Sequence, residues 1–367
     1  MKKILILTTS TGEGHNQAAK SISTSFVKSG YEVVIHDFLK NNSKILTKLF
    51  INGYEISASF FPKTYGFAYK LTDTSFTNKL LSMVFLFTKN KLLKLIHSEK
   101  PDIILLTHPF AVNIMGSLKK QGLNIPVISI VTDFKAHATY LDNNIDAFIT
   151  ASENTCSDMA LRGIDKNKLF AFGIPVKDEF LENKKDIKVI KSDDYFNILL
   201  MSGSMGLKNI SYVLKELLTN TNKLRITVVC GKNERLKEDL LQEYNHPIKN
   251  KKLHILGFSK DVDSLMKYSD LIISKPGGLT VTEAISKHLP ILIPFAIPGQ
   301  ETQNVEFLTS NGYGIYVDNL LEINLVINDL ISNKDMLTTM QNNLSNLASK
   351  YSKDKIVDIA NKLISIK

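Results

Sequence analysis

The stretch LIISKPGGLTVTEA, residues 271–284, carries the pattern that decides the fold. Its first four residues suit a buried strand, a turn with two glycines follows, and a helix is expected immediately after that turn. Such a strand–turn–helix unit is typical of α/β folds. The free N–H groups and the dipole at the helix start favour a phosphate, so the stretch predicts a pyrophosphate site. The residues expected there are Gly277, Gly278, Leu279 and Thr280.

Short apolar runs separated by helical patterns extend from this stretch in both directions. In the second half, the expected strands are residues 196–201, 225–230, 253–256, 271–274, 291–293 and 314–317. In the first half, they are residues 4–8, 32–37, 102–107, 127–131, 147–150 and 169–172. The alternation predicts two α/β units with parallel sheets, which bind ligands at the carboxyl edges of their strands. The expected division is residues 1–172, a linker at 173–185, residues 186–350 and a final segment at 351–367.

Length and composition agree with two globular domains. The chain has 367 residues, 44% hydrophobic and 22% charged, which excludes disorder as its main state. Two cysteines, Cys156 and Cys230, are too few for a disulfide framework and favour a reducing compartment. The apolar run at residues 4–7 is too short for a signal peptide or a spanning helix. We therefore expect a cytoplasmic location without a membrane span.

The net charge of +9 is compatible with either nucleic acid or anionic lipid as a partner. Residues 40–100 hold ten lysines and ten aromatic residues but only three acidic residues. Amphipathic helices of this composition lie on anionic bilayers; the alternative is a set of packed helices with solvated lysines. No nucleic-acid recognition motif accompanies the charge, so no nucleic-acid partner is expected.

Two motifs of the first half follow predicted strands. In STGEGHNQAA, residues 10–19, glycines lead into a helix start beside His15. In VTDFKAHATY, residues 131–140, Asp133 and His137 stand at the ligand edge of a sheet. Asp133 or His137 would act as a general base if hydrogen bonds held it in place. The alternative is that these are ordinary loop residues without a chemical role.

Three further features of the second half carry polar groups. MSGSMG, residues 201–206, would wrap an anionic group with backbone N–H donors, or form an ordinary turn. PGQETQNV, residues 298–305, places amides and a carboxylate suited to sugar hydroxyls at a helix start, or simply caps that helix. Glu283 would accept hydrogen bonds from ribose hydroxyls, or complement the helix dipole.

Two features resemble sites but have ordinary explanations. Asp261 and Asp263 form an Asp-x-Asp pattern found at metal sites, yet they begin a helix whose dipole they would complement. His108 follows the strand expected at residues 102–107, where it would line the ligand edge or be a plain loop residue. We expect no metal site.

Taken in order, GEGHNQAA, VTDFKAHATY, FGIPV, GSMG, SKPGGLT and PGQETQN resemble the glycolipid synthases of glycosyltransferase family 28. The strongest resemblance is to bacterial processive diacylglycerol glucosyltransferases and chloroplast monogalactosyldiacylglycerol synthases. Enzymes that add N-acetylglucosamine to a lipid-linked peptidoglycan precursor are more distantly similar. The resemblance implies a GT-B fold of two Rossmann-like domains facing each other across a cleft. The acceptor would bind to the first domain, the donor to the second, and the last helix would cross back to the first.

The resemblance also implies roles for particular residues. His15 and Asp133 would form the catalytic pair, with the base not assigned between them. The residues implied at the donor are Gly203, Ser204, Met205, Gly206, Phe258, Gly277, Gly278, Leu279, Thr280, Glu283, Gln300, Glu301 and Asn304. Those implied at the acceptor are Gly14, Asn16, His137 and Tyr140, where Tyr140 replaces a tryptophan common in relatives and keeps an aromatic platform.

The implied activity is transfer of glucose or galactose from a UDP-sugar to the hydroxyl of diacylglycerol, or of a glycosyldiacylglycerol, with inversion. The protein would act as a peripheral protein at an anionic membrane surface, on the cytoplasmic face of the cell membrane. The UDP-sugar is a co-substrate, and no metal or other cofactor is expected. The alternatives are a soluble UDP-sugar 2-epimerase and a UDP-N-acetylglucosamine transferase acting on a polyprenyl-linked acceptor. The donor sugar, the number of sugars added and the oligomeric state are left open.

Overall fold

A computed structural model describes residues 1–10, 13–38, 88–181, 193–201 and 209–366, together with Lys40, Gly66, Leu71 and Asp73. Most of the lysine- and aromatic-rich segment 40–100, the donor residues expected at 203–206 and part of the expected linker lie outside the described residues. Within the described part of the chain, no helix is long and apolar enough to span a bilayer.

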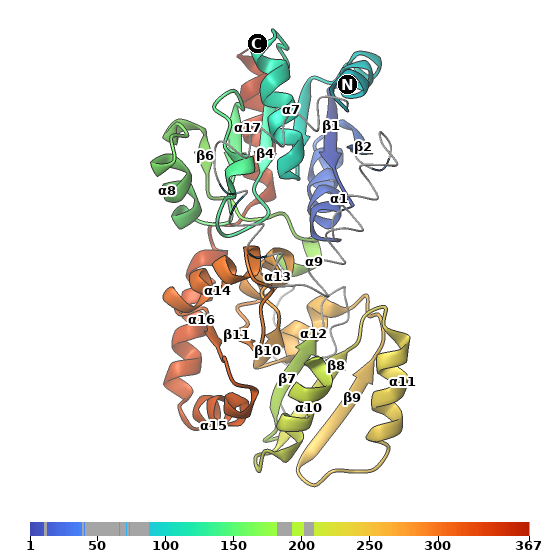
Figure 1. Ribbon diagram of the computed structural model, residues 1–367, viewed down its shortest axis with the longest axis vertical. Helices are drawn as coiled ribbons and strands as arrows, with labels where there is room; N and C mark the ends of the chain where they lie inside the picture. The colour runs from blue at the N-terminus through green and yellow to red at the C-terminus, as the bar shows by residue number, and fades with distance from the viewer. Residues whose placement is uncertain are drawn as a thin grey trace. The chain divides into compact units, whose positions relative to one another are not determined.

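The contacts of the chain divide it into two units (Figure 1). The first unit contains residues 1–177, 297–303 and 350–367, and the second contains residues 178–296 and 304–349. The segment 297–303, predicted within the second domain, therefore belongs to the first unit by its contacts. Each unit is built on a six-stranded sheet.

The first unit has a parallel sheet with strand order β2-β1-β3-β4-β5-β6. Its strands are β1 (Lys3–Thr8), β2 (Glu32–Asp37), β3 (Ile103–Leu106), β4 (Val127–Ile130), β5 (Ala147–Ile149) and β6 (Leu169–Phe170). Its helices include α1 (Glu13–Lys28), α7 (Pro109–Lys120), η2 (Ala138–Tyr140), α8 (Glu153–Leu161), η3 (Lys166–Lys168) and α17 (Lys353–Ser365), and residues 88–99 are helical as well. Strands β1, β3 and β4 are almost wholly buried because their apolar residues face packed elements on both sides.

The last helix, α17, packs in the core of the first unit although it is far from α1 in the sequence. Ile356, Val357 and Ala360 join a buried cluster with residues of α1 and the sheet. Figure 1 shows α17, in red, next to β4, and its contact with α1 comes from the same core. Burial of an Ile or Val side chain contributes about 1.5–3 kcal/mol. The Tyr31 hydroxyl also donates a hydrogen bond to Asn361 Oδ1, with an oxygen–oxygen distance of 2.7 Å.

The second unit also has a parallel six-stranded sheet, with strand order β12-β11-β10-β7-β8-β9, so two strands rather than one lie on the β8 side of its first strand, β7. Its strands are β7 (Phe196–Met201), β8 (Leu224–Val229), β9 (Lys251–Leu256), β10 (Leu271–Ser274), β11 (Ile291–Ile293) and β12 (Gly314–Tyr316). Its helices are α9 (Asp178–Leu181), α10 (Asn209–Thr219), α11 (Glu234–Glu243), α12 (Val262–Tyr268), α13 (Gly278–Ser286), η4 (Leu320–Glu322), α15 (Ile323–Ser332) and α16 (Lys334–Ala348). Helix α14 (Gln300–Ser310) is divided between the units: its residues up to 303 belong to the first unit and the rest to the second.

Each sheet has one point where the strand order reverses. In the first sheet the chain leaves β1 for β2 and then returns to the other side of β1 as β3. In the second sheet β7 and β10 have the same relation, and Met201 pairs with Ser274 at their carboxyl ends. Ligands of doubly wound folds bind in the crevice at such points. The topology thus places the motifs after β1, β3, β7 and β10 where binding is expected.

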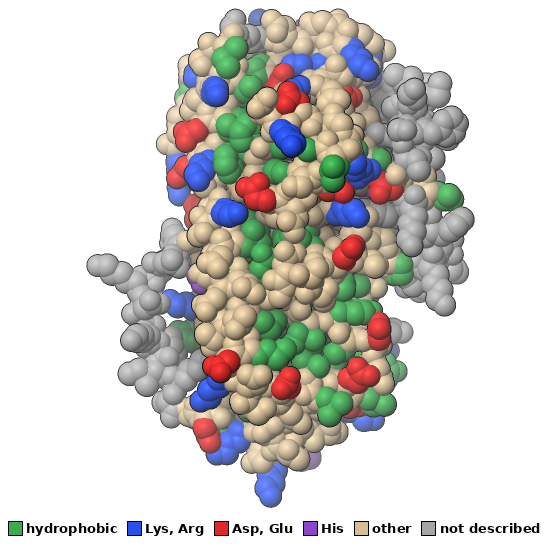
Figure 2. Space-filling view, turned by 90° about the vertical axis from the view of Figure 1, so that its left-hand side faces the viewer, with side chains coloured by type: hydrophobic (Ala, Val, Ile, Leu, Met, Phe, Trp, Pro, Cys, Tyr) green, Lys and Arg blue, Asp and Glu red, His purple; other side chains and the backbone are tan. Residues whose placement is uncertain are grey.

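The sequence-predicted strands all overlap observed strands, and the α/β fold class is confirmed. Helix α1 begins at Glu13, so Gly14 and His15 lie in its first turn rather than ahead of it. On the face drawn in Figure 2, basic and acidic side chains are interspersed, with apolar side chains between them. The excess of basic residues is therefore not segregated on that face.

Candidate functional site

The reversal point of the first sheet brings His15 to the end of β3. His15 Nδ1 lies 2.8 Å from the carbonyl oxygen of Thr107, which follows β3 directly. A carbonyl oxygen only accepts hydrogen bonds, so Nδ1 carries the proton and Nε2 carries the lone pair. The ring of His108 packs edge-on against His15 with a centroid separation of 4.4 Å. Burial disfavours the charged imidazolium and lowers the pKa of His15 to about 4, although the Thr107 carbonyl opposes this shift. His15 is therefore neutral near pH 7.

Asp133 lies three residues beyond the end of β4, the next strand in the sheet. Its side chain is buried, with an exposed fraction of 6%. Gln300 Nε2 donates a hydrogen bond to Asp133 Oδ1. Burial raises the pKa of Asp133 to about 6; the bond from Gln300 opposes this shift and the nearby Glu301 carboxylate adds to it. A carboxyl group with such a pKa can exchange a proton near neutral pH.

Thr132, which precedes Asp133 in the sequence, links His15 to Tyr140 by hydrogen bonds. Its Oγ1 lies 3.0 Å from His15 Nδ1 and 3.0 Å from the hydroxyl oxygen of Tyr140. The backbone N–H of Thr132 also donates to the Tyr140 hydroxyl at 3.4 Å. Sequence reasoning missed Thr132, and the only available signal was its position between a buried strand and Asp133.

Four residues expected at the acceptor occupy different environments. Gly14 faces open space, since an added Cβ would find no neighbour within 4 Å. The amide of Asn16 bonds to Thr8 Oγ1 at 2.9 Å and Ser10 Oγ at 3.1 Å, which holds the loop after β1. His137 is buried and caps η2, accepting a hydrogen bond from Thr139 N at 3.2 Å.

The expectation of an aromatic platform at Tyr140 is corrected by its burial. Its exposed fraction is 1%, and its ring belongs to the core of the first unit. Burial raises the pKa of its hydroxyl, which is therefore protonated at neutral pH. Tyr140 thus hydrogen-bonds to Thr132 within the core instead of offering a surface to a ligand.

The loop that carries these residues is anchored by one carboxylate. Asp73 Oδ1 accepts hydrogen bonds from Ala138 N at 2.6 Å and from an Arg162 guanidinium nitrogen at 2.9 Å. It also lies 4.0 Å from His137 Nε2. Asp73 therefore holds the η2 turn through Ala138 and Arg162.

Gln300 and Glu301, expected at the donor sugar, form hydrogen bonds with other groups of the protein in this structure. Gln300 is bonded to Asp133, as described above. Glu301 is buried, and its Oε2 accepts from the backbone N–H of Ile297 at 2.8 Å, which closes the turn before α14. Asn304 is buried as well, and its Nδ2 donates to the Pro276 carbonyl at 2.9 Å within the second unit.

In the second unit, the glycine turn after β10 leads straight into α13. Gly277 is the N-cap residue, with φ −68° and ψ 137°, and no side chain caps the helix there. Space above the turn is open, because an added Cβ at Gly277 would meet only Lys275 Nζ, at 3.8 Å. Gly278, Leu279 and Thr280 form the first turn, whose N–H groups lack helical partners. This end of α13 is suited to an anion.

Of two other predicted donor residues, Glu283 lies in the helix after that turn and Phe258 lies apart from it. Glu283 is half-buried in the second turn of α13. Phe258 follows β9 and is 64% exposed. Asp261 and Asp263 sit at the start of α12, where they complement its dipole. Among the described residues, no group of three or more His, Cys, Asp or Glu side chains is arranged to hold a metal ion.

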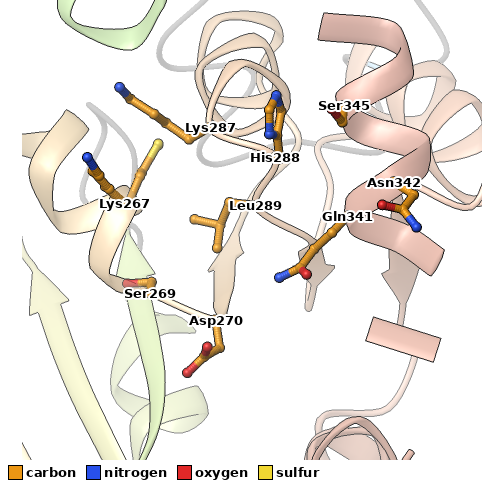
Figure 3. A pocket seen from close by; sticks show the side chains of 10 residues that line it. Lys267, Ser269, Asp270, Lys287, His288, Leu289, Gln341, Asn342 and Ser345 are labelled. Carbon is orange, nitrogen blue, oxygen red and sulfur yellow. The ribbon is translucent and has the colours of Figure 1, made fainter. Parts of the chain in front are cut away.

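A pocket of about 380 Å³ opens at the opposite, amino edge of the second sheet (Figure 3). Asp270 and Leu289 line it just before β10 and β11, and Gln341 lines it from α16. The Asp270 carboxylate already accepts hydrogen bonds from the backbone N–H and side-chain amide of Asn197, at 2.8 and 3.0 Å. The predicted site residues that the structure describes do not line this pocket.

Comparisons with known proteins agree with this architecture. A sequence model of monogalactosyldiacylglycerol (MGDG) synthase matches residues 15–176, and one of the glycosyltransferase family 28 C-terminal domain matches residues 197–363. A processive diacylglycerol beta-glucosyltransferase of Bacillus pumilus (strain SAFR-032) is 30% identical over 368 residues, which cover 97% of this chain and 94% of that protein.

Solved structures share the fold at lower sequence identity. MurG of Acinetobacter baumannii superposes with a TM-score of 0.69 at 18% identity, covering 99% of this chain and 100% of that one. The S. aureus MnaA–UDP structure gives a TM-score of 0.62 at 16% identity, covering 100% of this chain and 98% of that one. With two Rossmann-like units and full-length similarity to these enzymes, the chain belongs to the glycosyltransferase family 28 group of MGDG synthases and processive diacylglycerol glucosyltransferases, and it is a GT-B glycosyltransferase.

Proposed function

We propose that this protein transfers a hexose from a UDP-sugar to the hydroxyl of diacylglycerol or a glycosyldiacylglycerol. The observation that carries the proposal is the 30% identity to a processive diacylglycerol beta-glucosyltransferase over 97% of the chain. The name of that relative favours glucose, and the name of the first-half sequence model favours galactose. We take UDP-glucose as the first donor to test and UDP-galactose as the second.

We assign Asp133 as the general base. The acceptor hydroxyl oxygen attacks the anomeric carbon, the bond from that carbon to the diphosphate breaks, and the hydroxyl proton passes to the Asp133 carboxylate. A single in-line displacement of this kind inverts the anomeric centre. Asp133 suits the role because its pKa of about 6 lies near neutral pH, whereas that of His15 is about 4. A positioned base contributes roughly 10²–10⁴-fold to the rate.

His15 takes the second role on the acceptor side. Its Nε2 carries a lone pair, because Nδ1 donates to the Thr107 carbonyl. In that state Nε2 can only accept a hydrogen bond. We assign it to orient the acceptor by accepting from one of its hydroxyl groups. Gly14, with open space above it, allows the acceptor to approach this turn of α1.

The leaving diphosphate would be held by the first turn of α13. The N–H groups there lack helical partners and lie at the positive end of the helix dipole. Glu283 would bind the ribose, Phe258 would lie near the uracil, and residues 203–206 would add backbone donors. We propose that this arrangement replaces a metal ion, so that EDTA leaves the rate unchanged.

The acceptor is a lipid, so the reaction would take place at a membrane surface. Residues 40–100, with ten lysines, ten aromatic residues and three acidic residues, supply the composition that binds anionic bilayers. We propose that the protein is peripheral and works on the cytoplasmic face. Flotation with vesicles of phosphatidylglycerol should retain the protein, and vesicles of phosphatidylcholine alone should retain much less.

Release of UDP from UDP-glucose tests the proposal directly. The full chain is incubated with anionic vesicles that contain or lack diacylglycerol, and UDP is measured by a coupled assay. We expect release that depends on diacylglycerol, with UDP-galactose as the comparison donor. No release with either donor would overturn the proposal. UDP-N-acetylglucosamine conversion without any acceptor would instead identify a 2-epimerase, and its transfer to a polyprenyl-linked acceptor would identify the other alternative.

A further inference from the structure

Behind the candidate acceptor site, two buried hydroxyl groups connect the protein core to His15. The Tyr140 hydroxyl lies 3.0 Å from Thr132 Oγ1, and Thr132 Oγ1 lies 3.0 Å from His15 Nδ1. Thr132 and Tyr140 have exposed fractions of 7% and 1%. We propose that Thr132, held by Tyr140, is a positioning residue that fixes the ring of His15 with Nε2 unprotonated and directed to the acceptor. The inference rests on the proposed function, because that function gives Nε2 its task.

The hydrogen-bond roles follow from counting protons. The Thr107 carbonyl can only accept, so His15 Nδ1 must donate, and Thr132 Oγ1 must act as a second acceptor for the same N–H group. Shared N–H donors of this kind are common in proteins. The two acceptors follow different strands, β3 and β4. Together they restrain the orientation of the imidazole more tightly than one acceptor does, because a rotation of the ring that keeps one hydrogen bond lengthens the other.

Tyr140 fixes the orientation of Thr132. The Tyr140 oxygen accepts the backbone N–H of Thr132 at 3.4 Å, and its own proton is free to be donated to Thr132 Oγ1. With that proton, Thr132 Oγ1 accepts from both Tyr140 and His15. Tyr140 remains a donor at neutral pH, since burial raises the pKa of its phenol. A deprotonated or absent phenol would leave the Thr132 hydroxyl without a fixed direction.

The surroundings of His15 explain why this restraint is needed. Among the described residues, His108 at the N-cap of α7 packs its titratable ring edge-on against His15, with a centroid separation of 4.4 Å. His108 Nδ1 is occupied, because it accepts from the backbone N–H of Phe110 at 3.2 Å. Burial and the neighbouring His15 lower the pKa of His108. An aromatic contact fixes the separation of the rings but not which nitrogen of His15 is protonated.

The activity test uses isosteric variants in the full chain. Thr132→Val removes the second acceptor, and we expect the KM for the lipid acceptor to rise roughly fivefold to tenfold while kcat changes less than threefold. Thr132→Ser should restore most of the acceptor affinity because it keeps the hydroxyl. Tyr140→Phe should raise KM about threefold. Tyr31→Phe is the matched control, because it deletes another buried phenol, bonded to Asn361, far from His15.

A spectroscopic test separates this inference from the proposed function. Histidine labelled with ¹⁵N reports the tautomer directly, and the His15 signals are assigned by their loss in His15→Ala. We expect the Nδ1–H form in the wild-type protein and in both Thr132 variants, because the Thr107 carbonyl still accepts from Nδ1, and exchange broadening of the His15 ring signals in Thr132→Val alone. Unchanged His15 line widths and an unchanged acceptor KM in Thr132→Val would overturn the positioning role. If the wild-type protein shows no transfer at all while the line widths respond as expected, the proposed function fails and the restraint stands.

Discussion

The carboxyl edges of the two sheets present polar groups of different kinds. At the edge of the first sheet, side chains are held by hydrogen bonds: His15 to the backbone carbonyl of Thr107 and the hydroxyl of Thr132, and Asp133 to Gln300. At the edge of the second sheet, the turn at Gly277 exposes backbone N–H groups with no side-chain cap. Proton transfer needs a group with a tuned pKa in a fixed position, whereas phosphate binding needs several convergent donors without bulk. The first edge thus has the features that proton transfer needs, and the second has those that phosphate binding needs.

The comparison is most sharply tested at Asp133. Asp133→Asn keeps the size of the side chain and an oxygen for the bond from Gln300, but it cannot take a proton. We expect kcat to fall roughly 10²–10⁴-fold, the range that a general base contributes. The dissociation constant for UDP, measured by calorimetry, should change less than twofold because the donor edge is untouched. A kcat within threefold of wild type would exclude Asp133 as the base.

The same variant makes a prediction about stability. The pKa of Asp133 is raised from 3.8 to about 6 on folding, so the folded protein binds more protons than the unfolded chain between these values. Wild-type stability therefore falls as pH rises through this window, by at most about 3 kcal/mol. Asp133→Asn should lack this loss and be more stable than wild type at pH 8, measured by urea unfolding. Lower stability at pH 8 would contradict the burial of an ionised carboxylate.

The second edge is tested by Gly277→Asp. The backbone at Gly277 has φ −68°, so aspartate fits without strain and is a preferred N-cap residue. Its carboxylate would occupy the N–H groups of α13 and repel a diphosphate. We expect UDP affinity to fall roughly tenfold or more, while thermal stability stays equal or rises slightly. Gly277→Ser, which caps without charge, is the matched control and should lose less affinity.

Loss of the hydrogen bond between Gln300 and Asp133 should have a smaller effect, which is a shift in the pH dependence of the rate. Activity requires the ionised carboxylate, so the wild-type rate should fall below about pH 6, tenfold per pH unit at the lower end. The Gln300 donor lowers the pKa of Asp133, and Gln300→Met removes it. The acidic limb should then move to higher pH and the rate at pH 7 should drop roughly threefold to fivefold. Thr302→Ala, on the exposed face of α14, should leave the profile unchanged; a profile unaltered in Gln300→Met would refute the coupling.

The smallest expected change is at Asn304. Its side chain is 1% exposed and donates to the Pro276 carbonyl, which fixes the turn ahead of Gly277. Asn304→Ala should lower the free energy of unfolding by about 1–3 kcal/mol, because it leaves a buried acceptor without its partner. UDP affinity should fall only about twofold. A tenfold loss would mean that Asn304 contacts the donor itself, as the family resemblance implies.

The sequence predicted the sheets well because buried parallel strands are continuous apolar runs bounded by turns. It also placed His15, Asp133 and Gly277 at strand ends, where the topology concentrates ligand sites. It could not predict the bond between Gln300 and Asp133, since the two residues are 167 positions apart and only the fold brings them together. The family resemblance implied an aromatic platform at Tyr140, but it could not show that this ring is buried, because a phenol can serve a buried hydrogen bond as well as a binding surface.

The central claim is that the sugar leaves UDP for a lipid hydroxyl. The most direct measurement supplies UDP-glucose labelled with ¹³C at the anomeric carbon, together with diacylglycerol vesicles, and records the NMR spectrum of the extracted lipid. We expect the label in the lipid as a glyceryl glucoside with the coupling constant of a β-linkage, in amounts that match the released UDP. Label that remains in a nucleotide or appears as free glucose, with none in the lipid, would contradict the account.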